Sequence, residues 1–176
     1  MAQCLVNGAI GDFCGNNRGG STNFYVINYS SSTSYTTTGS SSYISGITAQ
    51  AGSAYEFTVP ENTLSFTDAG TFTPENQTRS FNHSVTVALN QLTTDKRDKL
   101  MLLTQGRVVV IVKDGNGRYW ALGTGQGLRV TAFTDMTGTA SSDRNGYEFT
   151  LSSVGGESEM PKEIAYTAFS STIVSA

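Results

Sequence analysis

The sequence predicts a mainly β protein, an antiparallel β-sandwich or barrel with one α-helix packed on it. Three observations support this fold class. Residues 107–152 contain four strand-like runs separated by glycine-rich turns, which is typical of a β-meander. Residues 77–89 alternate between apolar and polar side chains, as expected for a strand with one buried face. Residues 93–104 have the spacing and flanking residues of a helix.

The meander is predicted from its turns as much as from its strands. The segment 114–117 (Asp-Gly-Asn-Gly) and the pair Asn145-Gly146 are strong turn signals. Three glycines in the segment 123–127 (Gly-Thr-Gly-Gln-Gly) predict a strand corner, since this segment lacks the Lys-Ser/Thr tail of a phosphate-binding loop. The predicted strands of the meander are 107–113, 118–122, 128–134 and 147–152.

Other strands are expected on both sides of the meander. Residues 23–29 are dense in β-branched and aromatic side chains, and residues 54–59 alternate. Residues 63–73 continue the pattern, with a break expected near Asp68. Residues 163–169 alternate and predict a last strand. Within 77–89 His83 lies on the apolar face, where a half-buried histidine bonded to a neighbour is expected.

The helix is predicted from its ends and its apolar stripe. Thr93 or Thr94 can cap its first turn, and Gly106 can end it. Leu100 and Leu103 form a narrow apolar stripe, so this helix should lie on one face of a sheet.

Length and spacing bound the domain organisation. At 176 residues the chain predicts one domain, over 1–152, with a C-terminal extension over 153–176. The Ser/Thr-rich stretch 30–45 is interpreted either as a mobile surface loop or as an extended β-hairpin arm that turns near Gly39.

Composition disfavours several classes of function. A net charge of −3 argues against a nucleic-acid binder, which would need a basic patch. We expect no export signal and no contact with a membrane, because the N-terminus lacks an apolar core and the longest apolar run suits a buried strand. Cys4 and Cys14 are expected to be reduced; a bridge between them is the alternative.

We expect no catalytic, cofactor-binding or metal-binding residues. His83 is the only possible histidine base, and no serine or cysteine stands in a nucleophile-elbow sequence. Calcium binding at 114–117 is disfavoured because further acidic ligands are missing. Most of the acidic residues considered as a glycosidase pair occur in turns, where aspartate favours the backbone geometry. These acidic residues are Glu56, Asp68, Asp114, Asp135, Asp143 and Glu148.

The order of elements resembles one known group of proteins. FYVINY and AYEF are followed by VALNQLTTDKRDKLMLLTQGR, and DGNGRYWALGTGQGLRVTAFTDMTGTASSDRNGYEFTLS closes the core. This order is similar to that of the tail tube–like structural proteins of tailed bacteriophages, in particular the crAss-like phage group. The resemblance covers residues 1–152 and is strongest over 92–151.

The resemblance implies a virion structural protein of the phage tail, assembled in the host cytoplasm. Its subunits would form rings, usually hexameric, that stack into a tube with other tail or connector proteins. Genomic DNA would pass through this tube transiently, without specific binding. Alternatives are a connector or tail-ring protein and the tube of a tail-derived injection system. A remoter alternative, based on Tyr119, Trp120 and Tyr147, is a carbohydrate-binding β-sandwich.

Overall fold

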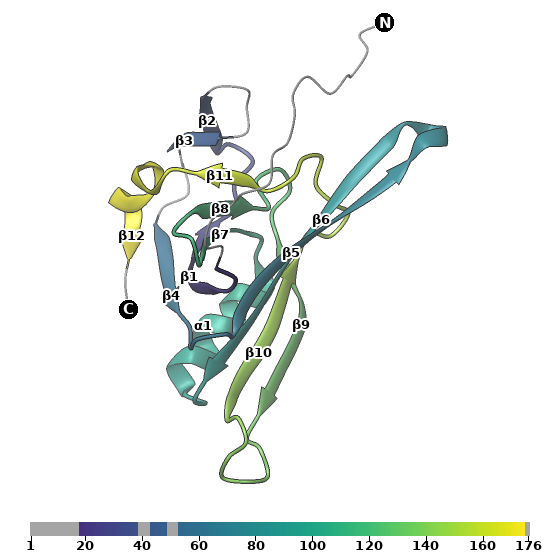
Figure 1. Ribbon diagram of the computed structural model, residues 1–176. Coiled ribbons are helices and arrows are strands. Elements are labelled where there is room, and N and C mark those ends of the chain that lie inside the picture. Colours follow the sequence, from purple (N-terminus) through teal and green to yellow (C-terminus); the bar gives the residue numbers. More distant parts are fainter. Residues whose placement is uncertain (1–17, 39–42, 49–52, 175–176) are drawn as a thin grey trace, which may run out of the picture.

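The computed structural model, which describes residues 18–38, 43–48 and 53–174, shows a mainly β protein with a single α-helix (Figure 1). The predicted fold class, a β-sandwich with one helix, is confirmed. The strands are β1 (Ser21–Asn28), β2 (Ser34–Thr38), β3 (Tyr43–Thr48), β4 (Ala54–Thr58), β5 (Leu64–Thr73), β6 (Thr78–Asn90), β7 (Val108–Asp114), β8 (Tyr119–Leu122), β9 (Arg129–Met136), β10 (Gly146–Ser152), β11 (Lys162–Ile164) and β12 (Ile173–Val174). The helices are α1 (Thr94–Gln105) and the 3-10 turns η1 (Pro74–Asn76), η2 (Tyr166–Ala168) and η3 (Ser170–Thr172).

The strands form two sheets of different size. The larger has the order β12-β4-β1-β7-β8-β11-β3-β2, and the smaller has the order β5-β6-β10-β9. Every pairing in the smaller sheet is antiparallel. The larger sheet is mixed, because β11 pairs in parallel with β3 and β12 pairs in parallel with β4.

Strand β7 lies in the middle of the larger sheet, and its sequence shows why. Its first five residues are all buried, as expected for a strand that is covered on both faces. Val108, Val110 and Val112 join the core between the two sheets, whereas Val109 and Ile111 join a second core on the opposite face. The C-terminal segment supplies Ile164 and Phe169 to that second core.

The prediction that residues 107–152 form one continuous meander was wrong. Strands β7 and β8 pair with each other in the larger sheet, and β9 and β10 pair with each other in the smaller one. The chain crosses between the sheets at the corner 123–127. Gly123 and Gly127 have φ values of 75° and 77°, a left-handed conformation that glycine adopts without strain.

Helix α1 agrees with its prediction. Thr93 is the N-cap, and its side chain accepts a hydrogen bond from the backbone N–H of Lys96 at 3.3 Å. Leu100 and Leu103 are the buried residues of α1, and both join the core between the sheets.

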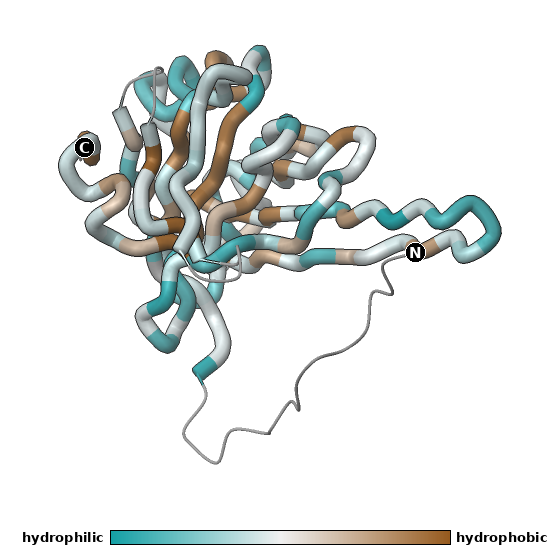
Figure 2. The backbone as a smooth tube through the Cα atoms, turned by 90° about the horizontal axis from the view of Figure 1, so that it is seen from above, coloured by the Kyte–Doolittle hydropathy of each residue, from teal (hydrophilic) through white to brown (hydrophobic). Residues whose placement is uncertain are grey.

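Strands β5 and β6 are longer than the body of the protein requires. The predicted break near Asp68 is absent, because β5 continues through Gly70 to Thr73. Gly70 pairs with Phe81 within this strand, and the exposed ring of Phe72 lies 2.8 Å from where a β-carbon of Gly70 would be. The two strands project from the body as a twisted hairpin (Figures 1 and 2). We call residues 71–80 the hairpin arm.

Residues 153–174 pack on the body instead of trailing from it. The strand expected over 163–169 ends at Ile164, and two 3-10 turns follow. The alternation of apolar and polar residues in the sequence continues beyond Ile164, but the backbone there forms turns. Phe169, at their junction, is 1% exposed and packs against the rings of Tyr25 and Tyr119.

The Ser/Thr-rich stretch forms a hairpin of β2 and β3, which is one of its two predicted alternatives. This hairpin lies at one edge of the larger sheet. The predicted turn at Gly39 lies outside the described residues, and so do Cys4 and Cys14. None of the helices in the described part of the chain has the length and apolarity needed to cross a membrane.

A pair of phenylalanines tests this account of the core. Phe149 and Phe133 are register partners on β10 and β9, but Phe149 is 1% exposed and Phe133 is 43% exposed. We expect Phe149→Ala to lower the free energy of unfolding by about 3–5 kcal/mol, because it leaves a cavity between the sheets. Phe133→Ala should cost less than half as much. Urea denaturation measures both, and equal costs would contradict the assigned core.

Candidate functional site

Three of the acidic side chains that were considered as candidates for catalysis, Asp114, Glu56 and Asp143, accept hydrogen bonds from nearby groups. Asp114 accepts hydrogen bonds from the backbone N–H groups of Asn116 and Arg118 and from Trp120 Nε1, at 2.8, 2.9 and 3.2 Å. It therefore closes the turn between β7 and β8. No group of three or more His, Cys, Asp or Glu side chains in the described residues could hold a metal ion.

Two other candidate carboxylates also have local partners. Glu56 accepts hydrogen bonds from Asn23 at 3.0 Å and Tyr25 at 3.3 Å. Burial, aided by the charge of Glu56, raises the pKa of Tyr25 to about 12. Asp143 accepts hydrogen bonds from the backbone N–H groups of Ala140 and Thr139, which lower the pKa of its carboxyl group and order the loop between β9 and β10.

The structure does not bring together the aromatic residues of the carbohydrate-binding alternative. Tyr147 is 4% exposed and belongs to the core between the sheets. Trp120 packs against this core, whereas Tyr119 packs against the second core on the opposite face of the larger sheet. These three rings therefore form no common exposed platform.

His83 is more buried than the sequence suggested. It is 1% exposed, so the expectation of a half-buried side chain was wrong. Its Nδ1 atom accepts a hydrogen bond from the backbone N–H of Gly123 at 3.1 Å, and its Nε2 atom lies 3.0 Å from the carbonyl oxygen of Glu159. The ring therefore links β6 to the corner 123–127 and to the C-terminal segment.

Burial lowers the pKa of His83, while the nearby Asp68 and Glu157 carboxylates act in the opposite direction. The ring is neutral in the fold at neutral pH. Because the folded pKa lies below the unfolded value of 6.5, the full stability is present above that pH. It is lost as the pH falls toward the folded pKa.

A second buried group, Glu157, binds the same corner. Glu157 is 3% exposed, and its two carboxylate oxygens accept hydrogen bonds from the backbone N–H groups of Gly125 and Gln126, at 3.1 and 3.0 Å. The corner was correctly predicted as a turn, but its role in holding an internal carboxylate was missed. Only Gly125 gave a signal, since a β-carbon there would collide with a carboxylate oxygen of Glu157.

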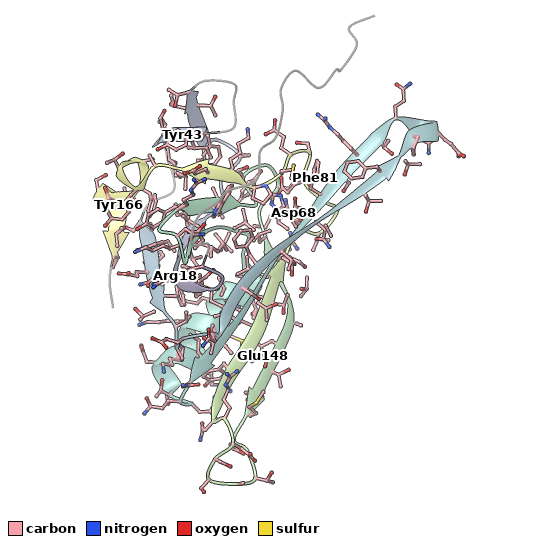
Figure 3. The ribbon with its side chains drawn as sticks, in the orientation of Figure 1. Arg18, Tyr43, Asp68, Phe81, Glu148 and Tyr166 are labelled. Atoms are coloured by element: carbon pink, nitrogen blue, oxygen red, sulfur yellow. The ribbon has the colours of Figure 1, made fainter. Side chains whose placement is uncertain are left out.

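The most distinctive surface of the described chain is one face of the smaller sheet. Alternate residues of its strands point away from the core, and no described element lies over them (Figure 1). Glu148 lies on this face (Figure 3). We call it the polar sheet face. Its polar members are Ser65, Thr67, Asn82, Ser84, Thr86, Arg129, Thr134, Glu148, Thr150 and Ser152.

The polar sheet face carries little charge. Its ionisable members are Glu148 and Arg129, which pairs with Ser152 at one end of β9; Arg144 lines a shallow hollow beside Glu148. Thr86 and Thr150 share a hydrogen bond at 3.3 Å across β6 and β10. A wide, almost uncharged layer of hydroxyl groups does not resemble a catalytic cleft.

The edges of this sheet and the hairpin arm are also unpartnered in the described chain. Strands β5 and β9 are the two outermost strands, and both are long. On the arm, Phe72 is 64% exposed and packs edge-on against Phe81, with ring centroids 5.8 Å apart. Comparison with protein-family models, curated proteins and solved structures finds no match to this chain.

The link between Glu157 and the corner leads to a stability prediction. In Glu157→Gln the amide group would place a donor opposite a backbone donor, so at least one of the two hydrogen bonds is lost. We expect unfolding to become easier by about 1–3 kcal/mol, measured in urea. Glu148→Gln, on the exposed polar sheet face, is the matched control and should change stability little. A Glu157→Gln variant with unchanged stability would contradict this role.

Proposed function

We propose that this protein is a structural subunit that assembles with copies of itself into rings. In this proposal the rings stack into a tube of the kind found in the tails of bacteriophages, through which DNA passes. The observation that carries the proposal is the smaller sheet, with its two open edges and its exposed polar sheet face. The resemblance over residues 1–152 supplies the phage tail as the setting.

Open edges are the first supporting feature. Exposed strand edges present unpaired N–H and C=O groups, and monomeric proteins usually protect them with short strands, bulges or a covering element. Here β5 has ten residues, and β9 has eight with one register shift between Val130 and Ala132 in its pairing with β10. Pairing between copies would satisfy the backbone groups along both edges.

Strand direction makes such pairing between copies regular. The four strands of the smaller sheet alternate in direction, so β9 runs opposite to β5. Rotation about an axis along the strands preserves these directions. The β9 edge of one copy would therefore meet the β5 edge of the next in antiparallel orientation, and repeated rotation closes the strands into one barrel.

The polar sheet face suits the inside of such a barrel. A strongly basic lining would bind the phosphate backbone and release counterions, and this would hold DNA in place. The one basic member of the polar sheet face, Arg129, lies at an end of β9, and most of the other members carry hydroxyl groups. DNA could then move past it without specific binding.

The hairpin arm supports contacts beyond the sheet. A two-stranded hairpin is marginally stable without packing on something else. The arm extends away from the body and is polar at its tip (Figure 2), yet it exposes Phe72 near its root. Contact with an adjacent subunit would cover this ring. The loop between β9 and β10 projects at the other end of the sheet (Figure 1) and provides another contact.

Purified protein tests the proposal directly. We expect native mass spectrometry to show closed rings, and negative-stain electron microscopy at high concentration to show stacked rings with a central channel. Single rings that do not stack would favour the connector alternative. A monomer at every concentration tested would contradict assembly altogether.

The open edge can be tested with a matched pair of lysine substitutions. Thr134 is exposed on β9, and Thr167 is exposed on a 3-10 turn of the opposite layer. Lysine on an edge strand disfavours pairing with another strand. Thr134→Lys should therefore shift the protein from rings to monomers in sedimentation velocity, whereas Thr167→Lys should leave the rings intact. Equal effects would exclude β9 as an interface.

The arm can be removed without disturbing the body. Phe81 exchanges both of its backbone hydrogen bonds with Glu157, so Thr71 and Ser80 form the next hydrogen-bonded pair of the hairpin. Asn-Gly in place of residues 72–79 would close this pair with a tight turn. This variant should fold, as judged by circular dichroism, but should form fewer and shorter stacks. Stacks of normal length would show that the arm makes no essential contact.

A further inference from the structure

We infer that His83 and its neighbours form an acid-sensitive latch at the root of the hairpin arm. In its neutral state the latch holds the corner 123–127 and the segment 153–161 against β6. Protonation of the ring releases both, while the rest of the two sheets remains folded. This inference rests on the contacts of His83 and does not depend on ring assembly.

The hydrogen bonds of His83 require one neutral tautomer. A backbone N–H can only donate, so Nδ1 must offer its lone pair to Gly123, 3.1 Å away. The proton of the ring is then on Nε2, which donates to the carbonyl oxygen of Glu159 at 3.0 Å. Both ring nitrogens are therefore engaged, each by a segment that is distant in the sequence.

Protonation is incompatible with this arrangement. The added proton would occupy Nδ1 and would face the N–H of Gly123, so that two donors would oppose each other. His83 is 1% exposed, so solvent cannot relieve the conflict while the corner stays in place. The corner must move away if the ring is to carry a charge.

The structure also contains a partner for the charged ring. The Oδ1 atom of Asp68 is buried, accepts no hydrogen bond, and lies 3.8 Å from Nε2 of His83. Asp68 and His83 are register partners on β5 and β6 where the arm leaves the body, and Figure 3 shows Asp68 at this position. A small shift of the ring would convert this contact into an ion pair.

The other charged groups near His83 are already engaged. Glu157 is held by the backbone N–H groups of the corner, and the side chain of Glu159 pairs with Lys162 at 2.5 Å. The corner itself contributes no charged side chain. Asp68 is thus the acidic group best placed to accept the charged ring.

The latch is connected to the C-terminal segment through the backbone. The N–H of Ser153 donates to the carbonyl oxygen of His83, and the N–H of His83 donates to the Ser153 hydroxyl group, both at 3.0 Å. Phe81 and Glu157 form a further bridge beside them. Release of the corner removes the bonds of Glu157 and loosens this whole strip along β6.

Nuclear magnetic resonance can observe the latch directly, because His83 is the only histidine of the chain. We expect its ring to carry the proton on Nε2 at neutral pH and to titrate below pH 6.5. Asp68→Asn should move this titration to still lower pH by removing the partner of the charged ring. The opposite tautomer, or an unshifted titration, would overturn the inference.

Hydrogen exchange between about pH 7.5 and pH 5 tests the release, with protection factors corrected for intrinsic rates. In the native sequence, protection over 123–127 and 153–161 should fall up to about tenfold per pH unit below 6.5, until the folded pKa is reached. Protection in β7 should persist. His83→Gln, which can accept from Gly123 and donate to Glu159 without titrating, should show no such loss.

Two results of this experiment would overturn the latch. One is a loss of protection in β7 together with the corner, which would show global unfolding instead of local release. The other is an equal loss in His83→Gln, which would assign the effect to another group. If His83→Gln does not fold, the titration of Asp68→Asn and the pattern of exchange in the native sequence still decide the question.

Discussion

The two layers of this protein depend on one tight corner. Within 123–127 the chain leaves the larger sheet and enters the smaller one, and two glycines with left-handed backbone make this change of direction possible. Beyond the corner, Leu128 exchanges backbone hydrogen bonds with Val108. Two buried side chains, His83 and Glu157, hold the corner from different parts of the chain. Its position therefore sets the spacing of both sheets and the packing of the C-terminal segment.

Local patterns in the sequence predicted most of the elements, because those patterns have local causes. The alternation in residues 81–89 reflects one buried face of β6, and the cap at Thr93 reflects the unpaired N–H groups of a helix start. The apolar run Val108–Val112 correctly predicted a buried strand. These signals do not depend on what the rest of the chain does.

What the sequence did not predict depends on contacts between distant residues. In the sequence, a turn between two strands of one sheet looks the same as a turn between strands of different sheets. The division of residues 107–152 between the two sheets was therefore missed. The same limit applies to the buried groups. Nothing near Glu157 or His83 in the sequence shows that residues of the corner will meet them. The polar sheet face likewise became visible only when four strands were placed in register.

The two parallel pairs of the larger sheet, β11 with β3 and β12 with β4, have a consequence for the order of folding. Glu163 pairs with Tyr43, and Ile173 pairs with Ala54. Strands β3 and β4, from the first third of the chain, therefore pair with strands near its end. Closing such large loops is slow, because the entropy is lost before the contacts form. During synthesis the smaller sheet can form while the larger one is still incomplete. The second core, which needs Ile164 and Phe169, is then the last part of the molecule to form.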